Sequence, residues 1–246
     1  MSELASPPIP HAAPVPASAS EPPSPVEPTP LWKALRVPAR FLTTVFFDLK
    51  TYHEKYVPRT GGVLLVANHQ SYLDPIMAAV HLQRPVSFFA KSELFENPYF
   101  SRFIRSLHAF PVKQGKADTS AIKEAIRRLK EGHILNIYPE GTRTPDGEIK
   151  PIEKGIGLIV RQAGVPVVPV AIDGTFNAYP SFRKYPVPYP VRVLYGPPMA
   201  LTGLKGDQIV QLIEKTLRAM LEELRAKRRV EQELARGRVW YAKRRV

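Results

Sequence analysis

The segment GGVLLVANHQSYLDP, residues 61–75, joins a short apolar run to a polar turn. The uncharged residues 62–67 are rich in branched apolar side chains, which is typical of a buried β-strand. Asp74 followed by Pro75 is typical of a helix start, with the aspartate as N-cap and the proline in the first turn. The segment therefore predicts a strand, a turn and a helix, with polar side chains at the carboxyl end of the strand.

His69 and Asp74 are too far apart in sequence to share one face of a helix. They can meet if His69 lies in the turn after the strand and Asp74 opens the next helix. The carboxylate would then hold the imidazole in one tautomer and stabilise its protonated form, so that the imidazole could take a proton from a hydroxyl. This segment alone equally allows a plain turn residue and a plain helix cap.

A second segment, Tyr138-Pro139-Glu140-Gly141-Thr142-Arg143, follows the apolar run 134–138. Gly141 allows the backbone to turn and approach a ligand closely. Thr142 offers a hydroxyl and a backbone N–H, and the guanidinium of Arg143 matches pairs of phosphate oxygens. Taken alone, the segment could be a surface turn with an ion pair between Glu140 and Arg143.

Over roughly residues 60–175, the ordered motifs resemble the glycerolipid acyltransferase family of the lysophosphatidic acid acyltransferase type. The resemblance rests on the histidine–four residues–aspartate block, on Glu-Gly-Thr-Arg, on FFAKSEL at 88–94 and on VVPVAI at 167–172. The family's phosphate block matches HAFPVK at 108–113, where Lys113 stands in place of the usual arginine. Lysine keeps the positive charge but loses the two-pronged guanidinium fork.

The resemblance implies acyl transfer from a thioester, either acyl-CoA or an acylated carrier protein, to the sn-2 hydroxyl of 1-acyl-glycerol-3-phosphate, giving phosphatidic acid. Other lyso-lipids or glycerol-3-phosphate are alternative acceptors. In this family His69 would be the general base and Asp74 its partner. The developing oxyanion needs donors, which Lys91 and nearby backbone N–H groups could supply, although Lys91 could equally be a surface lysine. The substrate site would contain Asn68, Lys113, Glu140, Gly141, Thr142 and Arg143, with the two cations on the phosphate and Glu140 positioning Arg143 or the glycerol hydroxyls.

The composition excludes several other chemistries. The chain has no cysteine, which rules out disulfides, thiolate metal sites and a cysteine nucleophile. Its six histidines lack metal-ligand spacing, so we expect no metal. There is no Gly-x-Ser-x-Gly elbow, no phosphate-binding P-loop and no complete dinucleotide fingerprint. We therefore expect no cofactor besides the acyl thioester co-substrate.

From residue 60 onward, short apolar runs alternate with helical patterns. This alternation predicts an α/β fold with a largely parallel sheet flanked by helices. Strands are expected at 62–67, 85–90, 107–112, 133–138, 165–172 and 190–195, and helices at 74–82, 97–106, 118–131, 154–163 and 207–228. His69, Lys91, Lys113 and Glu140 each follow a strand, so all four should gather at the carboxyl rim of the sheet, where ligands bind in such folds.

Residues 1–30 contain ten of the 27 prolines and few large apolar side chains, so we predict a disordered leader. Residues 31–58 are predicted to form amphipathic helices broken at Pro38, with 59–225 as the acyltransferase domain and 226–246 as a basic tail. The apolar stripe of the amphipathic segment could pack on the domain. Because lipid substrates come from membranes, we expect it to lie in a bilayer interface. Its members are Phe41, Leu42, Val45, Phe46, Leu49 and Tyr52.

The net charge of +13 is large for one domain, and residues 225–246 carry nine basic side chains against two glutamates. Trp240 and Tyr241 in the tail are of the kind that favours membrane interfaces. We therefore expect a membrane surface as partner, with peripheral or monotopic association on the cytoplasmic face, and the basic surface would also suit an acidic carrier protein. Nucleic acid is the alternative partner, but the chain contains no recognised nucleic-acid-binding module.

Overall fold

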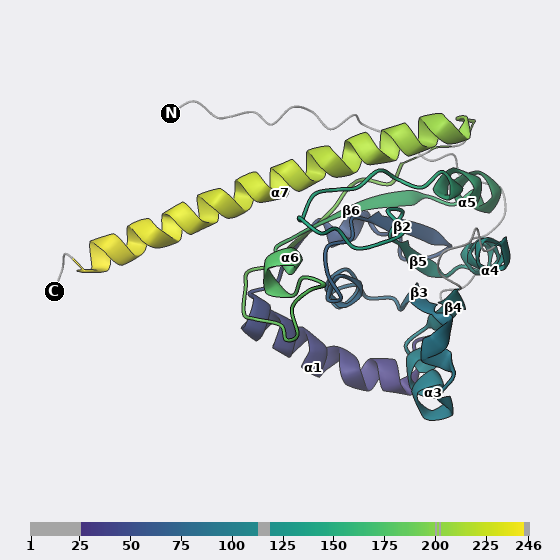
Figure 1. Cartoon of the computed structure of the whole chain (residues 1–246), viewed down its shortest axis with the longest axis horizontal. Helices are drawn as coiled ribbons and strands as arrows, with labels where there is room; N and C mark the ends of the chain where they lie inside the picture. Colours follow the sequence, from purple (N-terminus) through teal and green to yellow (C-terminus); the bar gives the residue numbers. More distant parts are fainter. Residues whose placement is uncertain (1–25, 113–118, 200, 202, 244–246) are drawn as a thin grey trace.

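The computed structural model describes residues 26–112, 119–199, 201 and 203–243, the last nine by their backbone only. A seven-stranded sheet forms the centre of the molecule, in the order β1-β7-β6-β2-β5-β3-β4 (Figure 1). Neighbouring strands are parallel except β6 and β7. The predicted fold class, a largely parallel α/β sheet with an N-terminal helix, is confirmed.

The elements run as follows. The strands are β1 (Lys50–Tyr52), β2 (Val63–Ala67), β3 (Val86–Lys91), β4 (Ala109–Val112), β5 (Ile134–Ile137), β6 (Val167–Asp173) and β7 (Arg192–Tyr195). The helices are α1 (Pro30–Phe47), α2 (Asp74–Met77), α3 (Pro98–Ser106), α4 (Thr119–Lys130), α5 (Gly155–Ala163), α6 (Thr175–Ala178) and α7 (Gly206–Lys243), with 3₁₀ turns at Glu54–Tyr56 and Ser92–Phe95.

Helices cover both faces of the sheet. On one face, Leu64 and Val66 of β2 belong to a core shared with α4, α5 and α7. On the other face, Leu65 and Val63 pack with buried side chains that include Met77 of α2. Every residue of β2 and β6 is buried. A parallel strand that is covered on both faces reads as a continuous apolar run rather than an alternating one, which explains the pattern of residues 62–67.

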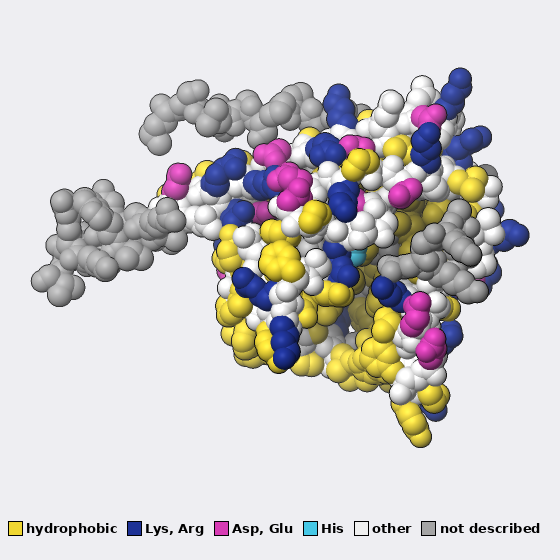
Figure 2. Space-filling model, in the orientation of Figure 1, with side chains coloured by type: hydrophobic (Ala, Val, Ile, Leu, Met, Phe, Trp, Pro, Cys, Tyr) yellow, Lys and Arg dark blue, Asp and Glu magenta, His cyan; other side chains and the backbone are white. Residues whose placement is uncertain are grey.

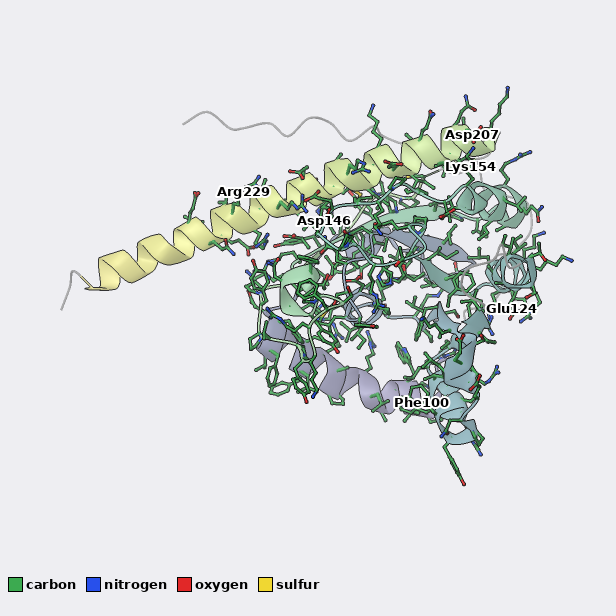
Figure 3. All side chains as sticks on the ribbon, viewed as in Figure 1. Phe100, Glu124, Asp146, Lys154, Asp207 and Arg229 are labelled. Atoms are coloured by element: carbon green, nitrogen blue, oxygen red, sulfur yellow. The ribbon has the colours of Figure 1, made fainter. Side chains whose placement is uncertain are left out.

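The N-terminal ends of α5 and α7 lie against each other, on the face of the sheet that α4 also covers. A Cβ added to Gly157 would come within 3.0 Å of the backbone of Gly206. Figure 3 shows Lys154 and Asp207, at the beginnings of these two helices, close together. The absence of side chains at the two glycines therefore allows the two backbones to touch.

The structure differs from the sequence prediction in several elements. β1 lies in the segment 31–58 that was predicted to be helical throughout, and α6 was not predicted. α2 ends at Met77 rather than at 82, and α7 extends to Lys243 rather than ending at 228. β1 has only three residues and pairs with β7 alone, so its pattern is too short to be read from sequence. The predicted disordered leader lies largely outside the described residues.

The predicted helix break at Pro38 is wrong, because α1 runs unbroken from Pro30 to Phe47. Both ends of the helix are held by tertiary contacts. Thr29 Oγ1 accepts from the N–H of Trp32 and donates to the carbonyl of Ser106, and the carbonyl of Phe47 accepts from Val191. These contacts offset the backbone hydrogen bond that an internal proline removes.

Gly62, at the entry to β2, leads to a testable prediction. A Cβ there would lie 1.8 Å from the carbonyl oxygen of Leu129, a backbone atom that cannot move aside freely. Gly62→Ala should lower the free energy of unfolding by about 1–3 kcal/mol in urea titrations. The control is Gly155→Ala, where nothing lies within 4 Å of the added Cβ. Equal stability of the two variants would contradict the close packing of β2 on α4.

Candidate active site

His69 and Asp74 meet directly in the turn between β2 and α2. His69 Nδ1 lies 2.8 Å from Asp74 Oδ2, and the aspartate side chain is fully buried while that of His69 is 20% exposed. The same carboxylate oxygen accepts from the backbone N–H groups of Gln70, at 2.6 Å, and Ser71, at 2.7 Å. An ionised carboxylate can only accept, so Nδ1 carries a proton and Nε2 is left as the basic nitrogen.

The expected capping role of Asp74 is wrong. Asp74 is the first residue of α2, and the capping position belongs to Leu73, whose side chain makes no cap hydrogen bond. The carboxylate instead points back across the turn to His69. The turn therefore orients the imidazole rather than simply starting a helix.

Tyr138, at the end of β5, stacks on the imidazole. The two ring centroids are 4.1 Å apart and the planes differ by 20°. Asn136 Nδ2 donates to the phenolic oxygen at 2.9 Å, and burial raises the pKa of Tyr138 well above its usual range, so the ring stays neutral. An aromatic face beside an imidazole stabilises the protonated ring. Sequence reasoning missed this contact, whose signal is the aromatic residue directly before Pro139.

Glu140 clamps the backbone of the histidine turn. Its Oε1 accepts from the N–H of His69 at 2.7 Å, and its Oε2 accepts from the N–H of Lys150 at 2.8 Å. Burial raises the pKa of Glu140, and these two backbone N–H groups partly oppose that rise. The carbonyl of His69 accepts in turn from Thr144 at 2.9 Å. Glu140 thus holds His69, whereas the sequence predicted that it would position Arg143 or the substrate hydroxyls.

Asn68 lies in the site but its side chain is committed to β6. Its Nδ2 donates to the carbonyl of Ile172 at 2.9 Å, and its Oδ1 accepts from the N–H of the same residue at 2.7 Å. The residue is 1% exposed. We expected Asn68 to contact substrate; the geometry instead gives it the task of fixing the end of β2 against β6.

A cavity of about 610 Å³ opens beside His69, beyond the carboxyl ends of β3 and β5. These strands pair only as far as Phe88 and Asn136, while β3 continues alongside β4. The sheet therefore separates here, as the hollow beside a histidine side chain in Figure 2 illustrates. Polar side chains at the cavity are His69, Lys91, Asn136, Tyr138, Thr142 and Glu153, and Gly141 contributes backbone. Apolar lining comes from Phe89, Val112, Ala121, Ile122, Ile137, Pro139, Ile156 and Ile159.

Of the two cations that were predicted to bind phosphate, the structure describes only Arg143. Lys113 lies outside the described residues. The guanidinium of Arg143 stacks over Tyr72, with its carbon 3.4 Å from the ring centroid, and is not among the residues that line the cavity. Its Nη1 is buried without a hydrogen-bond partner among the described residues. A buried donor without a partner is costly, and an anion would satisfy it.

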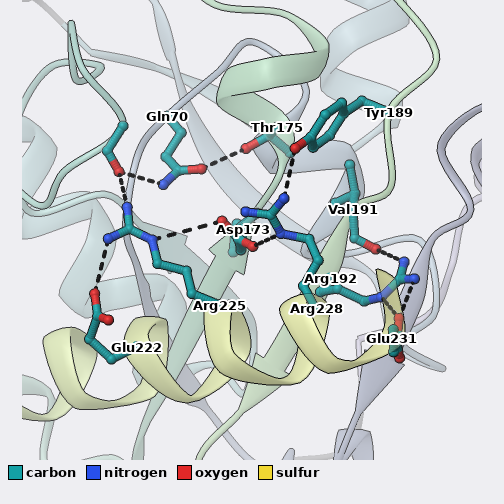
Figure 4. A network of polar contacts seen from close by, with 12 residues as sticks. Gln70, Asp173, Thr175, Tyr189, Val191, Arg192, Glu222, Arg225, Arg228 and Glu231 are labelled. Carbon is teal, nitrogen blue, oxygen red and sulfur yellow. Dashed lines mark hydrogen bonds and ion pairs between the residues drawn. The ribbon is translucent and has the colours of Figure 1, made fainter. Parts of the chain in front are cut away.

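Side chains of α7 contact residues beside the turn that carries His69 and Gln70 (Figure 4). Gln70 Nε2 and Arg225 Nη2 both donate to the carbonyl of Gly147, at 2.8 and 3.0 Å. Arg228 Nε donates to Asp173 Oδ2 at 2.5 Å, at the end of β6. Arg228, near the start of the predicted basic tail 226–246, therefore contacts the end of the sheet. The side chains from 235 onward lie outside the described residues.

The role of Glu140 yields a second prediction. Glutamine offers one acceptor oxygen where glutamate offers two, so one backbone N–H would face an amide N–H₂. Glu140→Gln should lower the free energy of unfolding by about 1–3 kcal/mol. Glu153→Gln, an exposed neighbour at the cavity, is the matched control. Urea unfolding of both variants measures the difference, and a stable Glu140→Gln protein would show that the clamp is dispensable.

Comparison with known proteins identifies the family of the chain. Residues 48–173 match the family model described as Acyltransferase. A 1-acyl-sn-glycerol-3-phosphate acyltransferase of Bacillus subtilis is 34% identical over 137 residues, which are 55% of this chain and 68% of that protein. One from Streptococcus pneumoniae is 34% identical over 181 residues, 70% of this chain and 65% of the relative. The chain spans only 34% of a chloroplast relative from Brassica napus.

Solved structures show the same relationship. The crystal structure of the 1-acyl-sn-glycerophosphate acyltransferase from Thermotoga maritima superposes with a TM-score of 0.71 at 30% identity, and the match covers 79% of each chain. Fold, family model and relatives therefore agree with one another. The chain belongs to the acyltransferase family of the 1-acyl-sn-glycerol-3-phosphate acyltransferase type.

Proposed function

We propose that the protein transfers an acyl group from a thioester to the sn-2 hydroxyl of 1-acyl-sn-glycerol-3-phosphate, which gives phosphatidic acid. The observation that carries the proposal is the pairing of His69 with the fully buried Asp74 at the edge of a largely apolar cavity. The names of the relatives from Bacillus subtilis and Streptococcus pneumoniae describe the same reaction. Acyl-CoA and an acylated carrier protein are both suitable donors.

In the proposed mechanism, His69 Nε2 takes the proton of the acceptor hydroxyl as its oxygen attacks the thioester carbonyl. The carbon–sulfur bond then breaks, and the departing thiolate recovers the proton from the imidazolium. Asp74 and the stacked Tyr138 ring both favour the imidazolium that exists between these two steps. General-base catalysis of this kind contributes about 10²–10⁴-fold to the rate.

Direct transfer, without an acyl-enzyme, fits the neighbouring side chains. The hydroxyl of Ser71 is buried and donates to the carbonyl of Tyr179 at 2.5 Å, so it is not presented to a substrate. Lys91 lies at the cavity and is our candidate for stabilising the oxyanion, together with nearby backbone N–H groups. The apolar wall formed by Phe89, Ile156 and Ile159 suits an acyl chain.

We assign the acceptor phosphate to Arg143 and Lys113, with Gly141 and Thr142 shaping the pocket. The unpartnered Nη1 of Arg143 supports this assignment, because a phosphate oxygen is a suitable acceptor for it. Gly141 adopts a positive φ of 69°, which a side chain would disfavour. The backbone can therefore turn sharply between Glu140, which holds the backbone of His69, and the guanidinium of Arg143.

We also propose that α1 rests on a membrane surface, on the cytoplasmic face. Val37, Phe41 and Val45 of this helix are 71, 66 and 61% exposed, so the apolar side chains of α1 largely face outward. Two predicted members of the stripe are not on the helix: Leu49 is buried beyond its end, and Tyr52 lies in β1. No described helix is both long and apolar enough to span a bilayer. Sedimentation with lipid vesicles measures this contact in a Phe41→Ser/Phe46→Ser variant, in which binding should fall.

The catalytic assignment predicts the effect of two substitutions. His69→Ala should lower the rate of thiol release by about 10²–10⁴-fold, because the base is lost. Asp74→Asn should also lower it strongly while the protein stays folded, because asparagine does not supply the negative charge that favours the imidazolium. His53→Asn, at an exposed histidine whose left-handed backbone asparagine tolerates, is the control. Near-normal transfer by His69→Ala would end the general-base proposal.

The phosphate assignment makes a prediction about the acceptor. Lys113→Ala and Arg143→Lys should each raise KM for 1-acyl-glycerol-3-phosphate by about 10–150-fold, the effect of losing a hydrogen bond to a charged group. Monoacylglycerol, which lacks the phosphate, should be used equally by the variants and the parent protein. Initial rates with both acceptors test this, and an equal loss on monoacylglycerol would remove the two cations from phosphate binding.

A further inference from the structure

The segment between α6 and β7, residues 179–190, displays aromatic and basic side chains together; we call it the α6–β7 loop. Phe182 is 73% exposed and Tyr185 is 66% exposed. Between them lie Arg183 and Lys184, which are also exposed. Neither cation forms an ion pair with a described residue, although the ammonium of Lys184 lies 5.3 Å from the centre of the Tyr185 ring. Large aromatic side chains that are exposed together on a surface often mark a site that binds a partner.

The loop holds these side chains outward in a defined shape. The N–H of Val187 donates to the carbonyl of Ala178 at 2.8 Å, which closes the loop at its base. The N–H of Arg183 donates to the carbonyl of Pro180 at 3.1 Å, and Phe182 meets the ring of Phe176 edge to face, with centroids 6.1 Å apart. The exposure of Phe182 therefore coexists with a fixed backbone.

The base of the loop touches the catalytic turn. The carbonyl of Tyr179 accepts from the Ser71 hydroxyl at 2.5 Å, and the ring of Tyr179 lies 5.6 Å from that of Tyr72. Ser71 donates its own N–H to Asp74, and Tyr72 carries the stacked Arg143. The position of the loop is thus coupled to the dyad and to the proposed phosphate site.

The far end of the loop adjoins the end of α1, because the N–H of Val191 donates to the carbonyl of Phe47 at 2.8 Å. Figure 1 shows the loop between α6 and β7 on the side of the molecule where α1 ends, and Figure 2 shows apolar and basic side chains intermixed there. The exposed apolar side chains of α1 and the aromatic residues of the loop therefore belong to neighbouring surfaces.

We propose that the α6–β7 loop is a second membrane contact that binds anionic lipid. Phe182 and Tyr185 would enter the interface, where aromatic rings are favoured, and Arg183 and Lys184 would face the lipid phosphates. The loop then holds the His69 side of the cavity against the bilayer from which the acceptor is drawn. The inference rests on the proposed lipid acyl transfer and adds the surface that orients the enzyme for it.

The first test measures binding of the full chain to vesicles of phosphatidylcholine alone and of phosphatidylcholine with phosphatidylglycerol. Arg183→Ser/Lys184→Ser should bind the anionic vesicles about 25-fold more weakly at low salt, since each cation contributes about 1 kcal/mol. Phe182→Ser/Tyr185→Ser should weaken binding to both vesicle types. Lys205→Ser/Lys215→Ser, which removes two exposed lysines of the α7 region, is the charge-matched control and should bind within about twofold of the parent.

The second test separates membrane contact from chemistry. With a short-chain acceptor below its micelle concentration, the loop variants should react at the parental rate; with the acceptor embedded in anionic vesicles, they should be slower by the same factor as their binding. Unchanged melting temperatures would confirm that the exposed substitutions leave the fold intact. Binding equal to the parent would overturn the proposal. The proposal would also be overturned if the loop variants bound vesicles normally but reacted more slowly with an acylated carrier protein as donor. The loop would then be a docking site for an acidic protein.

The outcomes also distinguish this proposal from the function on which it rests. A parent protein without acyl transfer to the soluble acceptor would contradict the proposed function, whereas the vesicle-binding comparison would still decide the role of the loop. The Phe41→Ser/Phe46→Ser chain provides the corresponding measurement for α1. If the Phe41→Ser/Phe46→Ser variant loses vesicle binding and the loop variants do not, α1 contacts the membrane and the loop does not, so the loop proposal fails.

Discussion

One buried carboxylate oxygen organises the candidate active site. Asp74 Oδ2 receives the imidazole N–H of His69 and the backbone N–H groups of Gln70 and Ser71. Three donors on a single buried oxygen define both the path of the turn and the plane of the imidazole. A side chain without an acceptor oxygen at position 74 would leave these donors unsatisfied at a fully buried position, where the cost is high. The proposed chemistry therefore uses a contact that is also structural.

The rest of the site is built outward from that turn by neighbouring strands. Asn68 ties the turn to β6, Glu140 ties it to the loop after β5, and the Tyr138 ring stacks on the imidazole. The separation of β3 from β5 opens a cavity beside these residues. Its wall is mainly apolar, and Lys91 is among its polar lining residues. This arrangement suits a molecule with an acyl chain at one end and a charged group at the other.

Much of this was accessible from the sequence, because it depends on local pattern. Continuous apolar runs predicted the buried parallel strands, and the alternation with helical stretches predicted the α/β class, which the structure confirms. The order of the motifs predicted the family, which the comparisons confirm. Polar residues that follow parallel strands must come out at one edge, so the sequence also placed His69, Lys91 and Glu140 at a common rim.

The tasks of individual side chains were decided only by tertiary structure. The sequence predicted an N-cap role for Asp74 beside its pairing with His69, but its carboxylate binds the backbone of its own turn instead. Glu140 was predicted to position Arg143 or the glycerol hydroxyls, but it binds the backbone of His69, which folding brings to it from another strand. The same is true of Arg143 on Tyr72 and of the helix that continues through Pro38. The sequence by itself determined the class of fold, the family and the rim on which the site forms. Hydrogen-bond partners, by contrast, are chosen by distance in space, and only the folded chain sets those distances.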